Sequence, residues 1–431
     1  MRRGEIIAIG SELLLGGRLD TNSIFLSDGL AEAGVEVRFK TVVGDVEEDI
    51  VAVLRTAARR AEVVLLTGGL GPTSDDCTRE AVACATGRPL RRRAGAVAGM
   101  AKQLAAWGRT PSAAQQRQGL IPAGAEVLAN QVGSAPGFAL RWQRALIAAL
   151  PGVPAEAERM FALSLAPMLR RAMASETAER IERLTLHTLG LPESELEQAI
   201  SGLVPRIGWI RLGLLASPLG VTVSLTATVS DNRLGQKRFG QFGEVLRNIR
   251  KKLGRHIYAE GPDTMEQVVG RELTSRGLVL ALAESCTGGL IGHRLTQVAG
   301  SSAYLDRGVV CYSNRAKTEL LDVPERLLIR HGAVSAPVAA AMAKGIRLRS
   351  QASVGLSVTG IAGPGGGAAK KPVGLVYVGL DTYQKNGTGK ASTTQAFHFH
   401  GSRETIKLRA SQAALNLLRE WLIATGPLDR P

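Results

Sequence analysis

The sequence of 431 residues lacks the long apolar run that a membrane-spanning helix requires. Hydrophobic residues make up 45% of the chain and charged residues 21%, a balance typical of soluble globular proteins. No apolar stretch approaches the roughly 20 residues needed to cross a bilayer. A short apolar segment at residues 6–9 follows Arg2 and Arg3, but Glu12 soon interrupts it, which argues against a signal peptide. We therefore expect a cytoplasmic protein with no membrane partner.

Cysteine and acidic residues are also scarce. Cys77, Cys84, Cys286 and Cys311 form neither a CxxC pair nor the spacing of a disulfide framework, so we expect reduced thiols. Only 38 Asp and Glu residues oppose 53 Lys and Arg residues, which gives a net charge of +15. Because the arginines are scattered along the chain, we expect this charge to favour anionic nucleotides, and we do not expect nucleic acid as a partner.

A chain of this length exceeds one ordinary hydrophobic core, so two or three domains are expected. Up to about residue 170, strand and helix patterns alternate. Apolar strands at 5–9, 35–43 and 62–67 are separated by helical spacing at 21–33 and 47–60. This alternation predicts an α/β fold, a parallel sheet with helices on both faces. Ligands of such a sheet bind beyond the C-terminal ends of its strands.

Two loops fall at those strand ends. Residues 10–16 follow the first strand, and residues 67–78 follow the third. In the second loop, glycines let the backbone approach a phosphate, and Asp75 and Asp76 could hold a hard divalent cation that neutralises it. The alternative is that both aspartates only favour the N-terminus of a helix beginning near Thr78. Taken alone, the loop favours this alternative.

The C-terminal third is organised around residues 283–289, with the sequence AESCTGG. An apolar run of strand length ends there, and residues 290–298 have helical spacing. A strand, a tight turn and a helix N-terminus together expose a nucleophile and aim backbone N–H groups at an anion or an oxyanion. Ser285 and Cys286 are the two candidate nucleophiles of this turn.

A serine nucleophile needs a base, because its hydroxyl is weak at its own pKa. No histidine completes a Ser–His–Asp pattern, since His293 lies inside the following helix and His331 in a later loop. Lys317, in the segment YSNRAK at 312–317, can take the proton if burial keeps its amine neutral. The alternative is a serine that caps a helix and a lysine at the surface. Spacing alone favours that alternative.

Five blocks in the C-terminal third occur in the order of one known domain. They are AESCTGG at 283–289, GSSAY at 300–304, YSNRAK at 312–317, GAVS at 332–335 and TGIAGP at 359–364. Together they resemble the C-terminal αβα domain of the CinA (competence- and damage-inducible) family. That domain is associated with nicotinamide mononucleotide amidohydrolase activity, so the resemblance implies this nucleotide as substrate.

The resemblance implies Ser285 as nucleophile, Lys317 as base and Tyr312 as proton relay, with no metal or other cofactor. Backbone N–H groups of the turn or of residues 359–360 would hold the oxyanion, and a helix N-terminus or a polar run would hold the substrate phosphate. The candidate substrate-binding residues are Thr287, Gly288, Gly289, Ser301, Ser302, Asn314, Arg315, Thr359 and Gly360.

A second set of blocks covers the first half of the chain. It comprises DTN at 20–22, VGD at 43–45, GGLGPTSDDCT at 68–78, APG at 135–137 and LPGVP at 150–154. These blocks resemble the N-terminal domain of CinA proteins, which is similar to the three-layer αβα fold of the molybdopterin-binding MoaB/MogA proteins. In the CinA family this domain is associated with metal-dependent ADP-ribose pyrophosphatase activity.

The second resemblance implies a divalent cation, Mg, Mn or Co, with potassium as an accessory ion. Related molybdopterin proteins often carry Gly-Asp-Glu in the first loop, whereas this chain has Gly10, Ser11 and Glu12, so one carboxylate is missing there. The remaining metal candidates are Asp45, Asp75 and Asp76. The candidates for nucleotide binding are Gly68, Gly69, Gly71, Thr73, Asp20 and Asn22.

The predicted organisation has three domains, a MoaB/MogA-like domain at 1–172, a small α+β domain at 173–258 and the CinA C-terminal domain at 259–426. The middle segment resembles the KH-like domain of longer CinA proteins. It has no GxxG loop between helices, which an RNA-reading KH module needs. We expect a spacer or dimerisation module, and the family implies a homodimer. Two alternatives stay open, a non-catalytic partner in DNA uptake or repair and a molybdopterin-binding protein.

Overall fold

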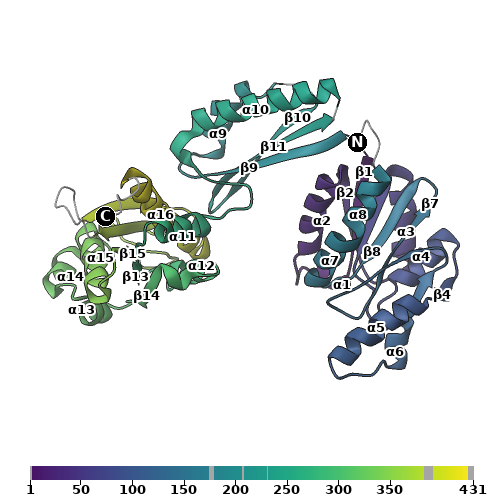
Figure 1. Cartoon of the computed structure of the whole chain (residues 1–431). Helices are drawn as coiled ribbons and strands as arrows, with labels where there is room; N and C mark the ends of the chain where they lie inside the picture. The colour runs from purple at the N-terminus through teal and green to yellow at the C-terminus, as the bar shows by residue number, and fades with distance from the viewer. Residues whose placement is uncertain (1, 174–178, 206–207, 231, 383–391, 426–431) are drawn as a thin grey trace. The chain divides into compact units, whose positions relative to one another are not determined.

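The computed structural model describes residues 2–173, 179–205, 208–230, 232–382 and 392–425. These residues form two compact units, and a sheet in the middle of the chain contributes segments to both units (Figure 1). The predicted α/β class is confirmed, with mostly parallel sheets at both ends of the chain. The domain boundaries at 172 and 258 stay predictions.

The N-terminal sheet has the strand order β2-β1-β3-β8-β7-β6. Its first four strands are parallel, and β7 and β6 are antiparallel to their neighbours. The strands are β1 (Arg2–Ile9), β2 (Val35–Val43), β3 (Val63–Thr67), β8 (Ala145–Leu150), β7 (Gly137–Trp142) and β6 (Glu126–Leu128). Thus the strands predicted at 5–9, 35–43 and 62–67 are present, and they lie side by side.

Two hydrophobic cores cover the two faces of this sheet, which makes three layers. Successive residues of β3 alternate between the cores, with Val64 and Leu66 in one and Val63 and Leu65 in the other. The first core is covered by α3 (Glu47–Arg60) and α4 (Thr78–Thr86), and the second by α2 (Thr21–Glu32), α7 (Pro154–Met160) and α8 (Ala166–Met173). A smaller lobe contains β4 (Leu90–Arg92), α5 (Ala94–Ala106), α6 (Ala113–Gln116) and β5 (Leu120–Pro122).

The middle sheet has the order β10-β11-β9-β12. Residues of β11 alternate between buried and partly exposed positions, because one face of the sheet packs on helices while the other remains partly open. The elements are β9 (Glu179–Thr188), α9 (Glu193–Ile200), β10 (Ile210–Ser217), β11 (Gly220–Ser230), α10 (Arg233–Leu253) and β12 (Ile257–Glu260).

The C-terminal sheet has the order β14-β13-β15-β16-β17. The strands β14 (Leu305–Val310), β13 (Leu280–Glu284) and β15 (Val354–Gly360) are parallel, and β16 (Leu375–Thr382) and β17 (Ser392–His398) are antiparallel. Two cores again lie on opposite faces. One face carries α11 (Met265–Ser275), α12 (Leu290–Thr296) and α16 (Arg403–Thr425), and the other α13 (Asn314–Leu321), α14 (Glu325–His331) and α15 (Ala336–Ser350).

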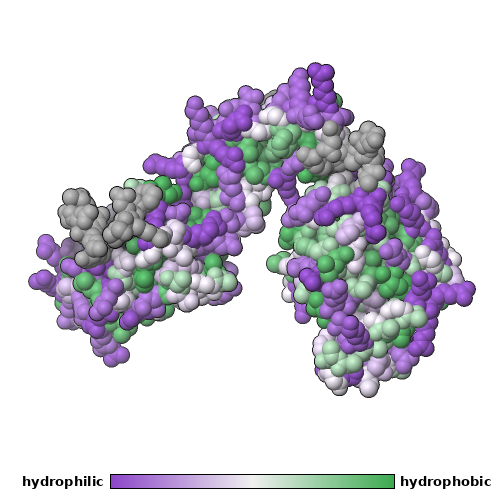
Figure 2. All heavy atoms as spheres, in the orientation of Figure 1, coloured by the Kyte–Doolittle hydropathy of each residue, from purple (hydrophilic) through white to green (hydrophobic). Residues whose placement is uncertain are grey.

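The surface agrees with the scattered charges of the sequence. Hydrophilic residues are spread over the visible face of each unit instead of forming one patch (Figure 2). Among the described residues, no helix combines the length and the apolar character needed to cross a membrane.

Candidate active site

The predicted nucleophile lies at the C-terminal end of a central strand. Ser285 follows β13 directly, and its backbone N–H donates to the Val358 carbonyl of β15 at 3.0 Å. Gly288 and Gly289 then turn the chain into α12 with φ angles of +64° and +93°, values that side-chain-bearing residues rarely adopt. The double glycine therefore produces the sharp turn that presents Ser285 at the edge of the sheet.

Lys317 meets Ser285 from the neighbouring loop and helix. Its Nζ lies 3.0 Å from Ser285 Oγ, 2.8 Å from the Cys311 carbonyl and 3.3 Å from the Tyr312 carbonyl. The residue is only 1% exposed, and its burial lowers the pKa of the amine. A neutral amine can donate its two hydrogens to the two carbonyls and turn its lone pair toward the serine hydroxyl. The alternative of a surface lysine is thus wrong.

The thiol beside Ser285 is a poor competitor for the role of nucleophile. Cys286 is buried, and burial raises the pKa of its thiol to about 12. Cys311 is also buried, and its burial raises the pKa of its thiol. Since the thiolate is the reactive form, both thiols are inert at neutral pH. This geometry favours the serine.

Tyr312 contacts the base with its backbone and not with its ring. Its side chain is 62% exposed, and its hydroxyl accepts a hydrogen bond of 2.9 Å from Arg403. Arg403, at the first position of α16, also donates to the Gly363 carbonyl at 2.7 Å. Within the described part of the chain, no hydrogen bond joins the Tyr312 hydroxyl to Ser285 or Lys317. Sequence reasoning missed Arg403, because this residue lies outside every sequence block that pointed to the site.

The N-terminus of α12 is already occupied by a carboxylate of the chain itself. The Glu284 carboxylate accepts hydrogen bonds from the backbone N–H groups of Gly289, Ile291 and Gly292 at 3.0, 3.1 and 2.8 Å. Of the N–H groups expected to hold the oxyanion, that of Gly289 is therefore already bonded to Glu284. Within residues 284–289, all of them described, the N–H groups of Cys286 and Thr287 have no oxygen partner. These two remain as candidate oxyanion donors.

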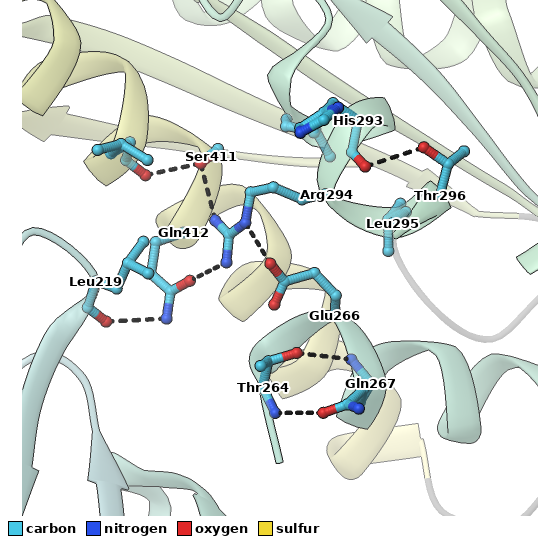
Figure 3. A network of polar contacts seen from close by, with 12 residues as sticks. Leu219, Thr264, Glu266, Gln267, His293, Arg294, Leu295, Thr296, Ser411 and Gln412 are labelled. Carbon is cyan, nitrogen blue, oxygen red and sulfur yellow. Dashed lines mark hydrogen bonds and ion pairs between the residues drawn. The ribbon is translucent and has the colours of Figure 1, made fainter. Parts of the chain in front are cut away.

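A buried arginine holds α12 against its neighbours. Arg294 donates from its three guanidinium nitrogens to Glu266 on α11 at 2.6 Å and to Ser411 and Gln412 on α16 at 2.8 and 2.7 Å (Figure 3). Gln412 in turn donates to the Leu219 carbonyl between β10 and β11 at 2.9 Å. The body of α12 is thus fixed independently of the turn that precedes it.

The other predicted substrate-binding residues do not all meet at Ser285. Thr359 and Gly360 end β15 next to the turn, where the Thr359 hydroxyl donates to the Ala333 carbonyl at 2.9 Å. Ser301 and Ser302 precede β14 instead, at the N-terminal edge of the parallel strands. A strand of six residues separates them from the Ser285 edge by roughly 15 Å. The structure does not bring Ser301 and Ser302 to the nucleophile. In parallel strands all C-terminal ends lie at one edge of the sheet, and these two serines lie at the opposite edge, before the N-terminal end of β14.

Two of the cavities found among the described residues lie on this domain. Asn314 and Arg315 line one of about 380 Å³ together with α14, and Arg315 is mostly exposed. A second cavity of about 400 Å³ lies between the first turns of α12 and α16. A Cβ built on Gly288 would lie 3.7 Å from the Lys407 Nζ, which places this cationic side chain beside the nucleophile turn. The lining residues of the second cavity are Leu290, Arg403, Glu404, Lys407 and Leu408.

In the N-terminal domain, the predicted glycine loop is tightly folded at the end of β3. A Cβ on Gly68 would lie 2.1 Å from the Ile9 carbonyl oxygen, and one on Gly69 would lie 2.2 Å from Thr78 Oγ1. Glycine is therefore required at both positions. Arg79 is completely buried beneath the loop, where it donates to the Leu70 and Gly71 carbonyls at 2.6 and 3.0 Å.

Two of the three carboxylates predicted to bind a metal accept hydrogen bonds within the protein. Asp76 accepts from the Gly71 and Thr73 N–H groups at 2.7 and 2.9 Å and from the Thr73 hydroxyl at 2.5 Å. Asp45 accepts from the Ser11 N–H at 2.7 Å. Among the described residues, no group of three or more His, Cys, Asp or Glu side chains could hold a metal ion. The described protein donors, including Asp75, therefore form no cluster of three ligands, and a cation here would need oxygens of the nucleotide as well.

The start of α2 carries unpaired polar atoms. Asp20 caps the helix by accepting from the Ser23 N–H, and the Asn22 side-chain amide donates to Thr67 Oγ1 and the Gly152 carbonyl. Asn22 Oδ1 and Ser23 Oγ are buried without a hydrogen-bond partner. An unpaired buried polar atom is costly, so a ligand that supplies the missing partner would bind favourably here.

Family models match three successive parts of the chain. The models are described as "Probable molybdopterin binding domain" at residues 5–171, "Damage-inducible protein CinA KH domain" at 183–259 and "CinA C-terminal domain" at 262–422. These matches confirm the resemblances that the sequence blocks indicated.

Curated relatives match nearly the whole chain. A competence-damage inducible protein of Moorella thermoacetica is 41% identical over 416 residues, 96% of this chain and 98% of the relative. One from Symbiobacterium thermophilum is 39% identical over 429 residues, 99% of both chains. A crystal structure of a competence/damage inducible protein from Agrobacterium tumefaciens is 41% identical over 37% of this chain and 96% of that chain, with a TM-score of 0.34.

Proposed function

This chain belongs to the CinA (competence- and damage-inducible) family, and on that premise we propose that it is a hydrolase of pyridine nucleotides. Its C-terminal domain deamidates nicotinamide mononucleotide to nicotinate mononucleotide and ammonia. The observation that carries the proposal is the 3.0 Å contact between Lys317 Nζ and Ser285 Oγ, with both residues buried. A nucleophile beside a base of lowered pKa is the arrangement that covalent amide hydrolysis needs.

In the proposed reaction, Ser285 Oγ attacks the carboxamide carbon while Lys317 takes the hydroxyl proton. The oxyanion that forms is held by the N–H groups of Cys286 and Thr287, which have no other oxygen partner. The C–N bond then breaks, the proton passes to the nitrogen, and ammonia leaves. Water attacks the resulting ester with Lys317 again as base, which frees Ser285 and gives nicotinate mononucleotide.

Tyr312 is proposed as the relay that passes the proton to ammonia. Its hydroxyl lies on Arg403, so the relay requires the ring to reach the leaving group when substrate is bound. Tyr312→Phe tests this role. A loss of about 10²-fold in kcat supports a relay. An unchanged kcat would leave Tyr312 with only the backbone carbonyl that faces Lys317.

The test of the amidohydrolase supplies nicotinamide mononucleotide to the purified full-length protein without added metal. Ammonia and nicotinate mononucleotide are measured, with Ser285→Ala beside the wild type. We expect the wild type to release ammonia and nicotinate mononucleotide in equal amounts. The Ser285→Ala variant should release both products at only a small fraction of the wild-type rate. A folded wild type that releases neither product would refute the proposal. It would favour the alternative of a non-catalytic partner in DNA uptake or repair.

For the N-terminal domain we propose ADP-ribose hydrolysis as a second function. The observation that favours a nucleotide here is the pair of unpaired buried atoms, Asn22 Oδ1 and Ser23 Oγ, at the start of α2. Because protein donors alone do not form a metal site, we derive no step through a cation. Equilibrium binding measurements with ADP-ribose and with a pterin separate the two candidate functions. Tighter binding of ADP-ribose supports this proposal, and tighter binding of the pterin supports a molybdopterin-binding protein.

Asp76→Ala and Asp76→Asn test the loop of that domain. Asp76→Ala frees the Gly71 and Thr73 N–H groups, so we expect ADP-ribose turnover to be lost. Asp76→Asn keeps one acceptor oxygen, and with it part of the loop shape. Full activity of Asp76→Ala would contradict the assignment.

We also propose a cytoplasmic homodimer with a middle domain that acts as a spacer, and light scattering of the purified chain measures its mass in solution.

A further inference from the structure

Glu284 lies directly before the nucleophile and links several parts of the site. Its side chain is buried, with the residue only 2% exposed, and both carboxylate oxygens accept from backbone N–H groups of residues 289–292. Its backbone carbonyl accepts from the Cys311 N–H at 2.9 Å. The Cys311 carbonyl, in turn, accepts from Lys317 Nζ at 2.8 Å. One residue therefore contacts both the turn of the nucleophile and the loop of the base.

The Glu284 carboxylate also serves as the helix cap that the two glycines of the turn cannot provide. Gly288 and Gly289 have no side chain to cap α12, and the first N–H groups of a helix have no partner within it. An anion at this position is favoured by the helix dipole, and its bonds to N–H groups are charge-assisted. Glu284 thus fixes the point at which the turn passes into α12.

The body of α12 is held separately. Arg294 anchors it to α11 and α16 through Glu266, Ser411 and Gln412 (Figure 3). With the helix fixed at that end, loss of the Glu284 bonds frees residues 285–289 and not the whole helix. The Ser285 hydroxyl and the N–H groups of Cys286 and Thr287 lie within this segment.

We propose that Glu284 is the positioning residue of the Ser285–Lys317 pair. Its carboxylate holds the turn so that Ser285 Oγ faces Lys317, and it directs anionic ligands away from α12 by occupying that helix N-terminus. The catalytic consequence rests on the proposed amidohydrolase function, whereas the effect on the turn does not. Both carboxylate oxygens of Glu284 are already bonded to backbone N–H groups of residues 289–292, so it acts through Ser285.

The test compares Glu284→Gln with the wild type. Glutamine keeps the shape but offers one acceptor oxygen, and its NH2 group faces a backbone donor. We expect kcat for nicotinamide mononucleotide to fall about 10- to 100-fold, because small displacements of reacting groups have effects of this size. KM should change less than about twofold, since the displaced Ser285 hydroxyl and the N–H groups of Cys286 and Thr287 act mainly in the transition state. Glu420→Gln, at an exposed glutamate of α16, is the matched control and should leave both constants unchanged.

Hydrogen–deuterium exchange resolved to single N–H groups gives a readout without substrate. In the wild type, the N–H groups of residues 289, 291 and 292 should exchange more slowly than that of Thr287. In Glu284→Gln they should exchange at least about tenfold faster, while residues 293–296 keep their protection. Faster exchange together with a wild type that does not deamidate the nucleotide supports the positioning role and refutes only the proposed function.

Two results would overturn the proposal. One is an unchanged kcat in a folded Glu284→Gln variant of an active wild type. The other is wild-type exchange as fast at residues 289, 291 and 292 as at Thr287, which can be measured even if the variant does not fold. Glu284→Asp, which keeps the charge on a shorter side chain, should recover part of the lost kcat. A purely structural role would lower the melting temperature without this recovery.

Discussion

Lys317→Met removes the base of the proposed reaction while keeping the volume of the side chain. The wild-type Nζ lies 3.0 Å from Ser285 Oγ, within direct reach of the proton that must leave the hydroxyl. General-base catalysis contributes about 10²- to 10⁴-fold. The variant should therefore lose that factor in kcat, equivalent to about 3–5 kcal/mol of activation free energy. The assay follows ammonia release from nicotinamide mononucleotide.

Lys317→Arg separates basicity from positive charge. Arginine keeps a cation and hydrogen-bond donors, but its pKa of about 12 or more prevents it from accepting a proton near neutral pH. We expect it to be as inactive as Lys317→Met. If the arginine variant kept kcat within about tenfold of the wild type, Lys317 would be acting through its charge, and its role as base would be refuted.

The pH dependence gives an independent measure of the same role. Burial lowers the pKa of Lys317 from the ordinary value of about 10.4. The active form is the neutral amine, so kcat/KM should rise with pH and level off above the lowered pKa. The residual activity of Lys317→Met should not show this ascending limb. An identical limb in both proteins would assign it to another group.

Three further predictions concern stability and reactivity. The native state binds fewer protons at Lys317 than the unfolded state between its lowered pKa and about 10.4, so the unfolding free energy of the wild type should rise with pH relative to Lys317→Met in that window. Denaturant titrations at several pH values measure this, and parallel curves would contradict it. Arg294→Met leaves the partly buried Glu266, whose side chain is 15% exposed, without its arginine partner and should lower the unfolding free energy by about 3 kcal/mol. A loss below about 1 kcal/mol in the same titrations would show that the network is not stabilising. Cys286→Ala should retain activity, because the raised thiol pKa of about 12 makes this residue inert. A rate as low as that of Ser285→Ala would instead make the thiol the nucleophile.

The N-terminal αβα domain could be predicted from local patterns, whereas the αβα fold of the C-terminal domain was implied by the resemblance of its sequence blocks. Apolar runs at 62–67 and 278–283 predict buried strands, and the structure has them as Val63–Thr67 and Leu280–Glu284. The position of Ser285 after such a strand follows from the same pattern. Residues at the C-terminal ends of parallel strands share one edge, so local sequence suffices to bring Ser285 and Thr359 together.

Long-range contacts account for what the sequence left open or misplaced. Spacing alone could not show that Lys317 is buried, because its burial depends on how α13 packs beside β13. Ser301 and Ser302 lie near Ser285 in sequence order, but they precede their strand and therefore reach the opposite edge. The sequence did not indicate that Glu284 caps α12. Its carboxylate reaches the N–H groups of residues 289–292 only because the turn brings the start of the helix back to the end of the strand.

The central claim is that Ser285 forms a covalent acyl intermediate. Nicotinamide mononucleotide is mixed with the full-length protein, the reaction is stopped with acid within one turnover, and digested peptides are analysed by mass spectrometry. We predict the mass of the acylated ester on the peptide that contains residues 283–289, located at Ser285 by fragmentation and missing in Ser285→Ala. Product release from the wild type with no adduct on that peptide, or with the adduct on Cys286, would contradict the account.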